Sequence, residues 1–436
     1  MSGPRILVLG AGPAGAAVAL GLQRLGHAVQ VVSDWRRFEA LEGVSQRVLD
    51  GLRQAGLHRA LACAALASPR RVVWGGDEQR VNQEFLLDRP AFDAAIREDL
   101  REAGVALVAA RVVAVESDAD GHRVQLENGE TLHGEFLVEA RGRQAPLAGK
   151  RQRGPETLSL LNQWQDVPGQ TVSAVQSLAE GWAWMARLAD GRCYWQITLD
   201  ATAAGLPGRE QLPAWCAQRR GESALVRELF GPSALQSARL HARSSTAILF
   251  DEACGANWLR VGDAAMAVDP LSGNGIFQSL SSALQAPAVI NTLLRYPART
   301  ALAQRFHQQR VAQLFLRFAR TGRDFYALEP RWGEQPFWRA RRGWPDAEPI
   351  HAAVDPAQVR VVRAPVIRHD SIEAAEVVVT RDQPLGIWHL QGVELAPLVL
   401  ALQAGAAPAE VLSTLAPAQR GMVGGWLKSQ GLLEPA

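Results

Sequence analysis

The apolar positions at the start of the chain predict a strand, a glycine turn, a helix and a second strand. An apolar run at residues 6–9 leads into glycines 10, 12 and 15, an alanine-rich stretch continues to Leu25, and a second apolar run covers residues 28–32. Short apolar runs on either side of a glycine turn and an apolar helix are typical of a βαβ unit. We therefore predict such a unit over residues 5–33.

The rest of the chain shows further strands and helices. Its periodicity predicts helices near 45–55 and 89–104, strands within 70–74, 83–87 and 107–126, a strand-rich region over 157–246, a strand, glycine turn and helix over 259–295, and a long helix over about 298–326. The pattern changes after residue 376, where a β-branched strand precedes three helical segments at 394–403, 408–415 and 417–429. The whole is an α/β pattern. Its last part fits either a small helical or winged-helix module or a packing extension of the main domain.

Composition and charge exclude several classes of protein. The net charge of +2, from 46 basic and 44 acidic residues, argues against a general nucleic-acid binder. No apolar run approaches the roughly 18 residues that a membrane span needs, and the apolar start leads into a glycine motif instead of a cleavage site. We therefore expect a cytoplasmic protein without a membrane segment. The four cysteines and nine histidines are dispersed, so we expect reduced thiols and no metal site.

Arginine is concentrated in one part of the chain. Residues 305–342 contain nine arginines and only three acids, Asp324, Glu329 and Glu334. This stretch is either a solvated helix face or a docking surface for an acidic partner. Lysine is rare, since Lys150 and Lys428 are the only two in the chain.

The glycine turn of the first βαβ unit points to a dinucleotide. Gly10, Gly12 and Gly15 form GxGxxG, with Ala14 inside the motif, so the backbone and the helix N-terminus can approach a pyrophosphate. The acid that usually holds a ribose hydroxyl at the end of the second strand is replaced by Ser33, with Asp34 beside it. Because residues 36 and 37 are arginines, NADP at this site is an alternative, but the next motif favours a flavin.

A second glycine motif carries a family resemblance. Residues 260–275 read RVGDAAMAVDPLSGNG and lead into a helix. This motif resembles the second FAD motif of the flavoprotein hydroxylases and flavin-dependent halogenases with the para-hydroxybenzoate hydroxylase-like fold. The resemblance implies that Gly262 and Asp263 bind the ribityl chain, that Pro270 lies near the flavin, and that the backbone of Gly273, Asn274 and Gly275 lies beside its pyrimidine edge. A helix N-terminus there would stabilise negative charge on reduced flavin.

Two further segments resemble the same family. Residues 88–93 resemble the start of its Arg-x-x-[LF]-[DE] helix, which would place Arg89 at the FAD, and residues 136–143 resemble the strand that re-enters its nucleotide domain. The resemblance spans about residues 5–290 and implies a Rossmann-type FAD-binding domain with an inserted β-sheet substrate domain. The expected ranges are 1–75, 89–155 and 247–297 for the FAD-binding domain, 76–88 and 156–246 for the substrate domain, 298–349 for a long helix and connector, and 350–436 for a small winged-helix-like domain.

Differences from the halogenases indicate hydroxylation. Residues 181–186, GWAWMA, resemble the halogenase W-x-W-x-I-P but lack its Ile-Pro. Halogenases of this family use a lysine in their N-terminal part to polarise hypohalous acid, and this chain has no lysine before Lys150. The resemblance therefore implies a monooxygenase that uses O2 and a flavin C4a-hydroperoxide in a pocket that excludes water. NAD(P)H or a separate reductase would supply the electrons.

The last segment indicates the substrate. Its strand and helices, which end in WLKSQGLL, resemble the peptide-recognition modules of enzymes that modify ribosomal polypeptides. The whole chain is similar to the flavoprotein monooxygenases that hydroxylate a peptidyl tryptophan during cysteine tryptophylquinone biogenesis, as in the maturation of quinohemoprotein amine dehydrogenase. We expect a tryptophan-containing polypeptide substrate, docked by residues 350–436 and the arginine-rich stretch. The alternatives are a hydroxylase or oxidase of a small aromatic metabolite and a non-catalytic flavoprotein assembly factor. The candidate catalytic residues are Asp269, Trp184 and His241.

Overall fold

The chain forms two compact units in the computed structural model, which describes residues 5–35, 39–64, 66–145, 149–350 and 355–433. The first unit comprises residues 1–286 and 311–347, and the second comprises 287–310 and 348–436. Two long helices, α7 (Gly275–Arg295) and α8 (Thr300–Ala327), contribute residues to both.

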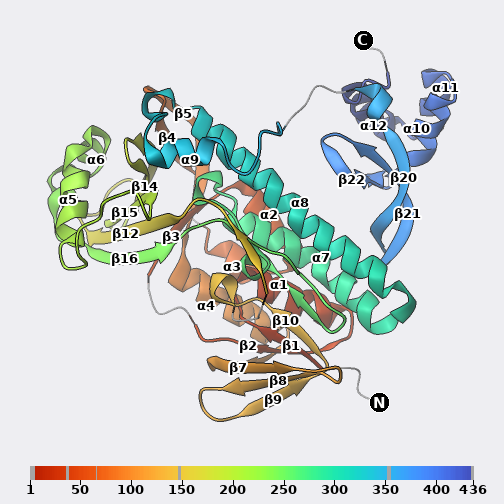
Figure 1. Cartoon of the computed structure of the whole chain (residues 1–436), viewed down its shortest axis with the longest axis horizontal. Helices are drawn as coiled ribbons and strands as arrows, with labels where there is room; N and C mark the ends of the chain where they lie inside the picture. Colours follow the sequence, from red (N-terminus) through yellow and green to blue (C-terminus); the bar gives the residue numbers. More distant parts are fainter. Residues whose placement is uncertain (1–4, 36–38, 65, 146–148, 351–354, 434–436) are drawn as a thin grey trace. The chain divides into compact units, whose positions relative to one another are not determined.

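A parallel sheet of five strands forms the first layer of the larger unit (Figure 1). Its order is β18 (Trp258–Arg260), β10 (Phe136–Glu139), β1 (Arg5–Leu9), β2 (Ala28–Val32) and β6 (Ala106–Val108). The associated helices are α1 (Pro13–Arg24), α2 (Gln46–Ala55), α3 (His58–Ala62) and α4 (Arg89–Glu102). Residues 6–9 are completely buried, as expected for a parallel strand covered on both faces. The βαβ unit predicted for residues 5–33 is confirmed.

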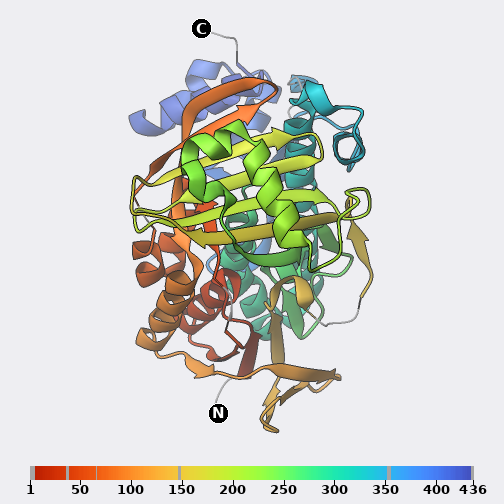
Figure 2. The same cartoon turned by 90° about the vertical axis from the view of Figure 1, so that its left-hand side faces the viewer.

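A mixed sheet of eight strands forms the second layer (Figure 2). Its order is β16 (Arg239–Ser244), β12 (Thr157–Gln165), β15 (Arg192–Asp200), β14 (Gly181–Arg187), β13 (Val172–Leu178), β4 (Ser68–Trp74), β5 (Asp77–Asp88) and β3 (Leu41–Val44). Helices α5 (Leu212–Glu222) and α6 (Ala224–Phe230) cover one face, where Phe230 packs with Trp164 and Trp195 in one apolar core. These two short helices were not expected within the strand-rich region. Because β3 and β4 lie in this sheet, we propose that the substrate domain also includes these two strands.

Two smaller sheets complete the first unit. The first is an antiparallel meander of β7 (Val112–Ser117), β8 (His122–Leu126) and β9 (Thr131–Gly134). The second joins β11 (Arg151–Arg153), β17 (Ile248–Phe250) and β19 (Met266–Ala267). Helix α9 (Pro336–Arg342) follows α8 along the chain. The long helix predicted near 298–326 is confirmed by α8.

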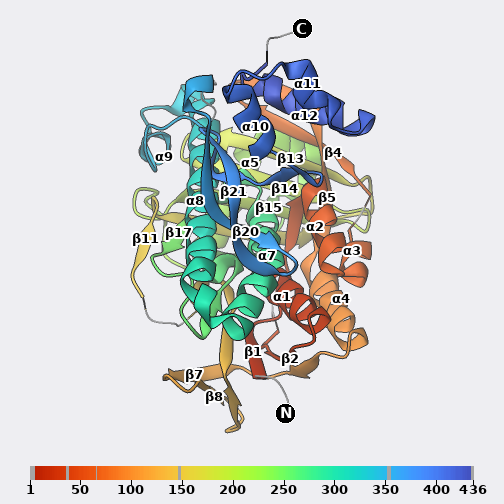
Figure 3. The ribbon, with the colours of Figure 1, turned by 90° about the vertical axis from the view of Figure 1, so that its right-hand side faces the viewer.

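The second unit has a core of its own. Its strands and helices can be followed in Figure 3. An antiparallel sheet of β20 (Arg360–Arg368), β21 (Ser371–Thr380) and β22 (Gln383–Ile387) is followed by a short hairpin, β23 (His389–Leu390) and β24 (Val393–Glu394), and by helices α10 (Ala396–Gln403), α11 (Pro408–Ser413) and α12 (Pro417–Ser429). The three predicted helices are confirmed, whereas β20 and β22 were missed. Much of β20 is partly exposed, so its sequence lacks the apolar run that marks a buried strand.

Removing apolar volume from this core should destabilise the second unit. Leu427 is completely buried there, so Leu427→Ala is expected to cost about 3 kcal/mol through lost burial and the cavity that remains. Hydrogen exchange of the amides of α10 and α12 measures this loss for the unit by itself. The matched control is Leu400→Ala on α10, because Leu400 is 44% exposed. Equal protection of the amides in the two variants would contradict the prediction.

In the described ranges no helix combines the length and apolar character that crossing a membrane requires. The same ranges contain no group of three histidine, cysteine, aspartate or glutamate residues that could hold a metal ion.

Candidate functional site

A large cavity lies within the first unit. Its volume is about 1630 Å³, and its walls include the glycine turn after β1, the end of β2, the segment 263–275 and one edge of the eight-stranded sheet. Pockets for small molecules usually measure about 300–1,000 Å³. The cavity therefore offers room for a dinucleotide together with part of a second molecule.

The first glycine turn brings the N-terminus of α1 to the cavity. Gly10 has a φ of 102°, and an added Cβ would lie 2.5 Å from the carbonyl oxygen of Ala140. A Cβ on Gly15 would lie 1.9 Å from the carbonyl oxygen of Gly10, so both glycines allow close backbone packing. Gly12 differs, because nothing lies within 4 Å of its added Cβ. The backbone at Gly12 thus faces open space at the positive end of a helix, which suits a pyrophosphate.

Ser33 stabilises this turn. Its Oγ accepts a hydrogen bond of 3.2 Å from the backbone N–H of Ala11. Asp34 follows it along the chain, is exposed and also lines the cavity. Arg36 and Arg37, on which the NADP alternative depended, lie outside the described residues.

Asp263 lies at the second glycine motif and is held by two neighbours. Gln278 Nε2 donates a hydrogen bond of 2.8 Å to Asp263 Oδ1, and Arg143 Nε lies 3.4 Å from Asp263 Oδ2. Burial raises the pKa of this carboxyl, and the positive charge of Arg143 opposes the shift. A polar ligand that replaced lost hydration, such as a chain of hydroxyl groups, would satisfy the carboxylate.

The start of α7 forms another cavity wall. Gly273 has a φ of 62°, and nothing lies within 4 Å of a Cβ added at Gly273 or Gly275. The backbone carbonyl oxygen of Asn274 accepts from the N–H of Gln278 at 2.8 Å and so belongs to the first turn of the helix. Pro270, Gly273 and Gly275 line the cavity. This positive helix end faces the space where the family resemblance places the flavin ring.

The structure brings most of the predicted site residues to this one cavity. Those that line it are Gly10, Gly12, Ala14, Ser33, Asp34, Arg89, Asp263, Pro270, Gly273 and Gly275, together with Asp269, Trp184 and His241. The other predicted residues belong to the glycine turns that form these walls without being lining residues themselves: Gly15, Gly262 and Asn274. At Gly262, for example, the φ is 58° and an added Cβ would lie 2.9 Å from Ala14 Cβ. Two helix ends, exposed glycine backbone and the partly buried carboxylate of Asp263 therefore fit FAD.

Arg89 is the first residue of α4 and lines the cavity. It is buried, and its guanidinium lies 3.0 Å from Glu42 Oε1 and 2.8 Å from Asp93 Oδ1. The two carboxylates fix the guanidinium at the cavity wall.

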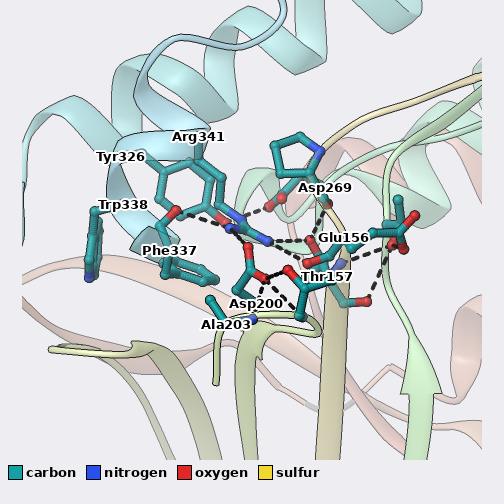
Figure 4. Close-up of polar contacts among 12 residues, drawn as sticks. Glu156, Thr157, Asp200, Ala203, Asp269, Tyr326, Phe337, Trp338 and Arg341 are labelled. Carbon is teal, nitrogen blue, oxygen red and sulfur yellow. Dashed lines mark hydrogen bonds and ion pairs between the residues drawn. The ribbon is translucent and has the colours of Figure 1, made fainter. Parts of the chain in front are cut away.

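Asp269 lies in a buried polar network (Figure 4). Its Oδ1 accepts hydrogen bonds of 2.9 Å from the hydroxyl of Tyr326 and from the backbone N–H of Leu271. Trp182 Nε1 in turn donates to the Tyr326 oxygen at 3.2 Å. Burial raises the pKa of Asp269, and the positive charge of Arg341 is the largest opposing influence.

Arg341 is itself held inside the protein. Its Nη1 lies 3.3 Å from Asp200 Oδ2, and its Nη2 donates a hydrogen bond of 2.7 Å to Thr157 Oγ1 (Figure 4). The guanidinium is thus a fixed positive charge in the surroundings of Asp269.

Aromatic side chains line another part of the cavity. Trp182 and Trp184 are two residues apart on β14, so they share one face of the sheet. Trp184 Nε1 lies 3.3 Å from Glu84 Oε1, its hydrogen-bond acceptor. His241 lines the cavity from β16 at the sheet edge, where it pairs with Leu161 of β12. The indole of Trp184 is partly exposed and offers a flat apolar surface to the cavity, whereas Trp182 borders the cavity with only 3% of its area exposed.

Four residues of the site were not predicted from the sequence. These are Arg143, Arg243, Gln278 and Tyr326. Arg143 ends the segment 136–143 that carried part of the family resemblance, so its motif could have identified it. Arg243 lines the cavity and donates to Gln196 Oε1 at 3.0 Å, and burial lowers the pKa of its guanidinium. Tyr326 comes from α8 and has no local signal in the sequence.

The chain is similar to several known proteins. The family model described as tryptophan halogenase matches residues 45–381. The solved structure of peptidyl tryptophan dihydroxylase QhpG, described as essential for tryptophylquinone cofactor biogenesis, is 64% identical, covers 99% of this chain and 100% of its own, and has a TM-score of 0.90. The flavin-dependent halogenase CmlS is 17% identical with a TM-score of 0.79, over 99% of this chain and 96% of its own, which shows a shared fold. A tryptophan 2-halogenase from Chondromyces crocatus is 24% identical over 381 residues, which are 78% of this chain and 71% of that protein.

Proposed function

The chain belongs to the tryptophan halogenase family of flavin-dependent enzymes, and from this premise we propose that it hydroxylates a tryptophan side chain within a polypeptide during tryptophylquinone biogenesis. The identity of 64% over nearly the whole chain to a peptidyl tryptophan dihydroxylase carries this proposal. The protein is an FAD-dependent monooxygenase.

The cavity residues have separate roles toward the cofactor. Bound FAD, once reduced, supplies the activation of O2. Gly12 and the start of α1 would hold its pyrophosphate, Asp263 its ribityl hydroxyl groups, and the start of α7 its pyrimidine edge. Ser33 would hold the glycine turn beside it, and Arg89 would lie at the cavity wall next to it.

Asp269 and the indoles act on the substrate in this proposal. Trp182 and Trp184 would orient the substrate indole by ring contacts. Hydroxylation of an aromatic ring replaces a C–H bond by a C–O bond, so the ring carbon must release a proton. Asp269 is the carboxylate of the cavity wall that we assign as acceptor of this proton, with Tyr326 as a positioning residue.

The positions of the lysines argue against halogenation. The two lysines of the chain, Lys150 and Lys428, both fall in the described part, and neither is among the residues that line the cavity there. A lysine that polarises hypohalous acid is therefore missing from the described wall.

Mass spectrometry of a candidate polypeptide tests the proposed function. The FAD-loaded protein, reduced without air, is mixed with O2 and a tryptophan-bearing polypeptide precursor of a tryptophylquinone. We expect that polypeptide to gain one or two oxygen atoms at tryptophan, and added chloride or bromide to leave no halogen on it. If the polypeptide stays unchanged while free tryptophan or another small aromatic compound is hydroxylated, the assignment of the substrate is wrong.

The second unit and the arginine-rich stretch are proposed to dock the polypeptide. Part of that stretch is used internally, because Arg320 pairs with Asp346 and Arg331 with Glu329. Fewer arginines than the sequence suggested are therefore left to attract an acidic partner. NAD(P)H or a separate reductase is the proposed electron donor, and the cytoplasm is the proposed compartment.

Deleting residues 355–436 tests the docking role. We expect the shortened protein to keep FAD but to bind and hydroxylate the polypeptide at least about tenfold less well, because recognition contacts outside the cavity are lost. Calorimetric titration with the polypeptide, together with flavin absorbance, measures both properties. Undiminished polypeptide binding by a shortened protein that still holds FAD would assign docking to the first unit alone.

A further inference from the structure

Four side chains that are readily oxidised form a continuous path inside the first unit. We call Trp182, Tyr326, Trp338 and Trp74 the ring path. Trp182 lines the cavity, and its Nε1 lies 3.2 Å from the Tyr326 oxygen. The ring centroids of Tyr326 and Trp338 are 5.8 Å apart, and those of Trp338 and Trp74 are 5.3 Å apart. Each member therefore contacts the next.

The ring path leads from the cavity wall to a partly exposed side chain. Trp182, Tyr326 and Trp338 are 3%, 2% and 0% exposed, whereas Trp74 is partly exposed. Two members are also fixed by hydrogen bonds, from Trp338 Nε1 to the carbonyl oxygen of Leu178 at 3.0 Å and from Trp74 Nε1 to that of Phe325 at 3.2 Å. Fixed rings in contact favour electron transfer, because electronic coupling falls steeply with distance.

Tyr326 has the partner that its oxidation requires. A phenol that loses an electron becomes strongly acidic and must release its proton at once. The Tyr326 hydroxyl donates to Asp269 Oδ1 at 2.9 Å, so a carboxylate is already in place to accept that proton (Figure 4). Any buried hydroxyl needs a hydrogen-bond acceptor, but a carboxylate is an acceptor that can also take up the proton.

We propose that the ring path is a protective route for electrons, along which the protein reduces strong one-electron oxidants formed in the cavity when activated oxygen is not consumed by the substrate. Trp182 gives one electron to the oxidant, an oxygen-centred radical derived from O2 such as the hydroxyl radical, which is thereby reduced to hydroxide. Tyr326 then gives an electron to oxidised Trp182 and its proton to Asp269.

The remaining steps return Tyr326, Trp338 and Trp74 to their reduced states. Trp338 gives an electron to the oxidised Tyr326, which takes its proton back from Asp269, and Trp74 gives an electron to Trp338. A reductant from solution, such as a thiol or ascorbate, finally reduces Trp74. In balance, one electron passes from that reductant to the oxidant and the ring path is unchanged.

A matched control residue lies outside the ring path. Trp164 is 5% exposed and packs edge-on against Phe230 at a centroid distance of 5.0 Å, within the separate core beneath α5 and α6. Trp164→Phe and Trp338→Phe thus remove comparable buried indoles, but only Trp338→Phe interrupts the ring path. Trp74→Phe interrupts its outer end at a partly exposed position, where loss of folding is a smaller concern.

The experiment takes the FAD-loaded full chain through repeated cycles of reduction and O2 exposure, with no polypeptide and with catalase present. Peptide mapping by mass spectrometry then locates oxidised tryptophan and tyrosine. Flavin absorbance measures the fraction of the protein that still holds FAD after each cycle. In the unchanged protein and in Trp164→Phe we expect oxidation to concentrate at Trp74. In Trp338→Phe the oxidation should move to Trp182 and Tyr326, and the protein should lose its flavin after several-fold fewer cycles. In Trp74→Phe the oxidation should move to Trp338.

Two results would overturn the proposal. The first is an oxidation map that is the same in the unchanged protein, Trp338→Phe and Trp74→Phe at every position they share. The second is a map of the unchanged protein that is reproduced by adding hydrogen peroxide from solution without cycling, because oxidation at Trp74 would then reflect exposure alone. Neither readout depends on hydroxylation of a polypeptide, so the ring path and the proposed substrate can fail separately.

Discussion

Gly12→Glu is expected to weaken FAD binding by roughly 100-fold or more, which corresponds to about 3 kcal/mol. Nothing lies within 4 Å of a Cβ at Gly12, so the new side chain extends into the cavity without displacing protein atoms. Its carboxylate would stand at the helix end that suits the pyrophosphate and would repel that anion. Titration of the apoprotein with FAD, followed by flavin fluorescence, measures the loss.

The folded state of this variant should remain intact. Circular dichroism melting of the apoprotein is expected to match that of the unchanged protein. Gly425→Glu is the control, because Gly425 is an exposed glycine of α12 with nothing within 4 Å of an added Cβ. Normal FAD affinity in Gly12→Glu would show that the pyrophosphate lies elsewhere.

Asp269→Asn is expected to lower the rate of hydroxylation by about 100-fold to 10,000-fold, the usual range for loss of a general base or acid. The amide keeps the shape of the side chain but cannot accept the proton that the ring carbon releases. FAD content should be unchanged. Single-turnover hydroxylation of the polypeptide measures the rate, and Asp118→Asn in the exposed turn before β8 is the control.

The pH dependence gives a second measure of Asp269. Its pKa is raised by burial, so the carboxyl is protonated, and unable to accept a proton, at a higher pH than an ordinary aspartate would be. The rate should therefore fall as the pH is lowered through this raised pKa and recover as the pH rises. This acid limb should be absent in Asp269→Asn. An unchanged rate and an unchanged profile in that variant would remove Asp269 from the mechanism.

The cofactor half of the site could be predicted because its signals are local. Glycine turns need backbone conformations and close approaches that other residues do not allow, as at Gly10 and Gly262, so the residue type itself marks the position. The apolar runs beside them fixed the strand and helix on either side. The N-terminal βαβ unit and the segment 260–275 could therefore be identified without coordinates.

The substrate half could not be predicted in the same way. Tyr326 and Arg341 come from α8 and α9, far along the chain from Asp269 and Asp200, and their contacts arise only when the helices pack on the sheet. The presence of an arginine or a tyrosine does not indicate which residue it will contact. The sequence of the arginine-rich stretch is therefore as consistent with a solvated helix face as with a docking surface or with internal ion pairs. In the structure part of that stretch is buried or paired.

The sequence by itself therefore determined the α/β class, the two glycine turns at which we propose that FAD binds and, through its resemblance, the family. Only the tertiary structure decided that β3 and β4 join the eight-stranded sheet, that Asp269 accepts from Tyr326, and that the ring path begins at the cavity. The physical reason is the range of the interactions. Backbone conformation and hydrophobic periodicity are set within a few residues, whereas burial, charge pairing and ring contacts depend on segments that meet only in the folded chain.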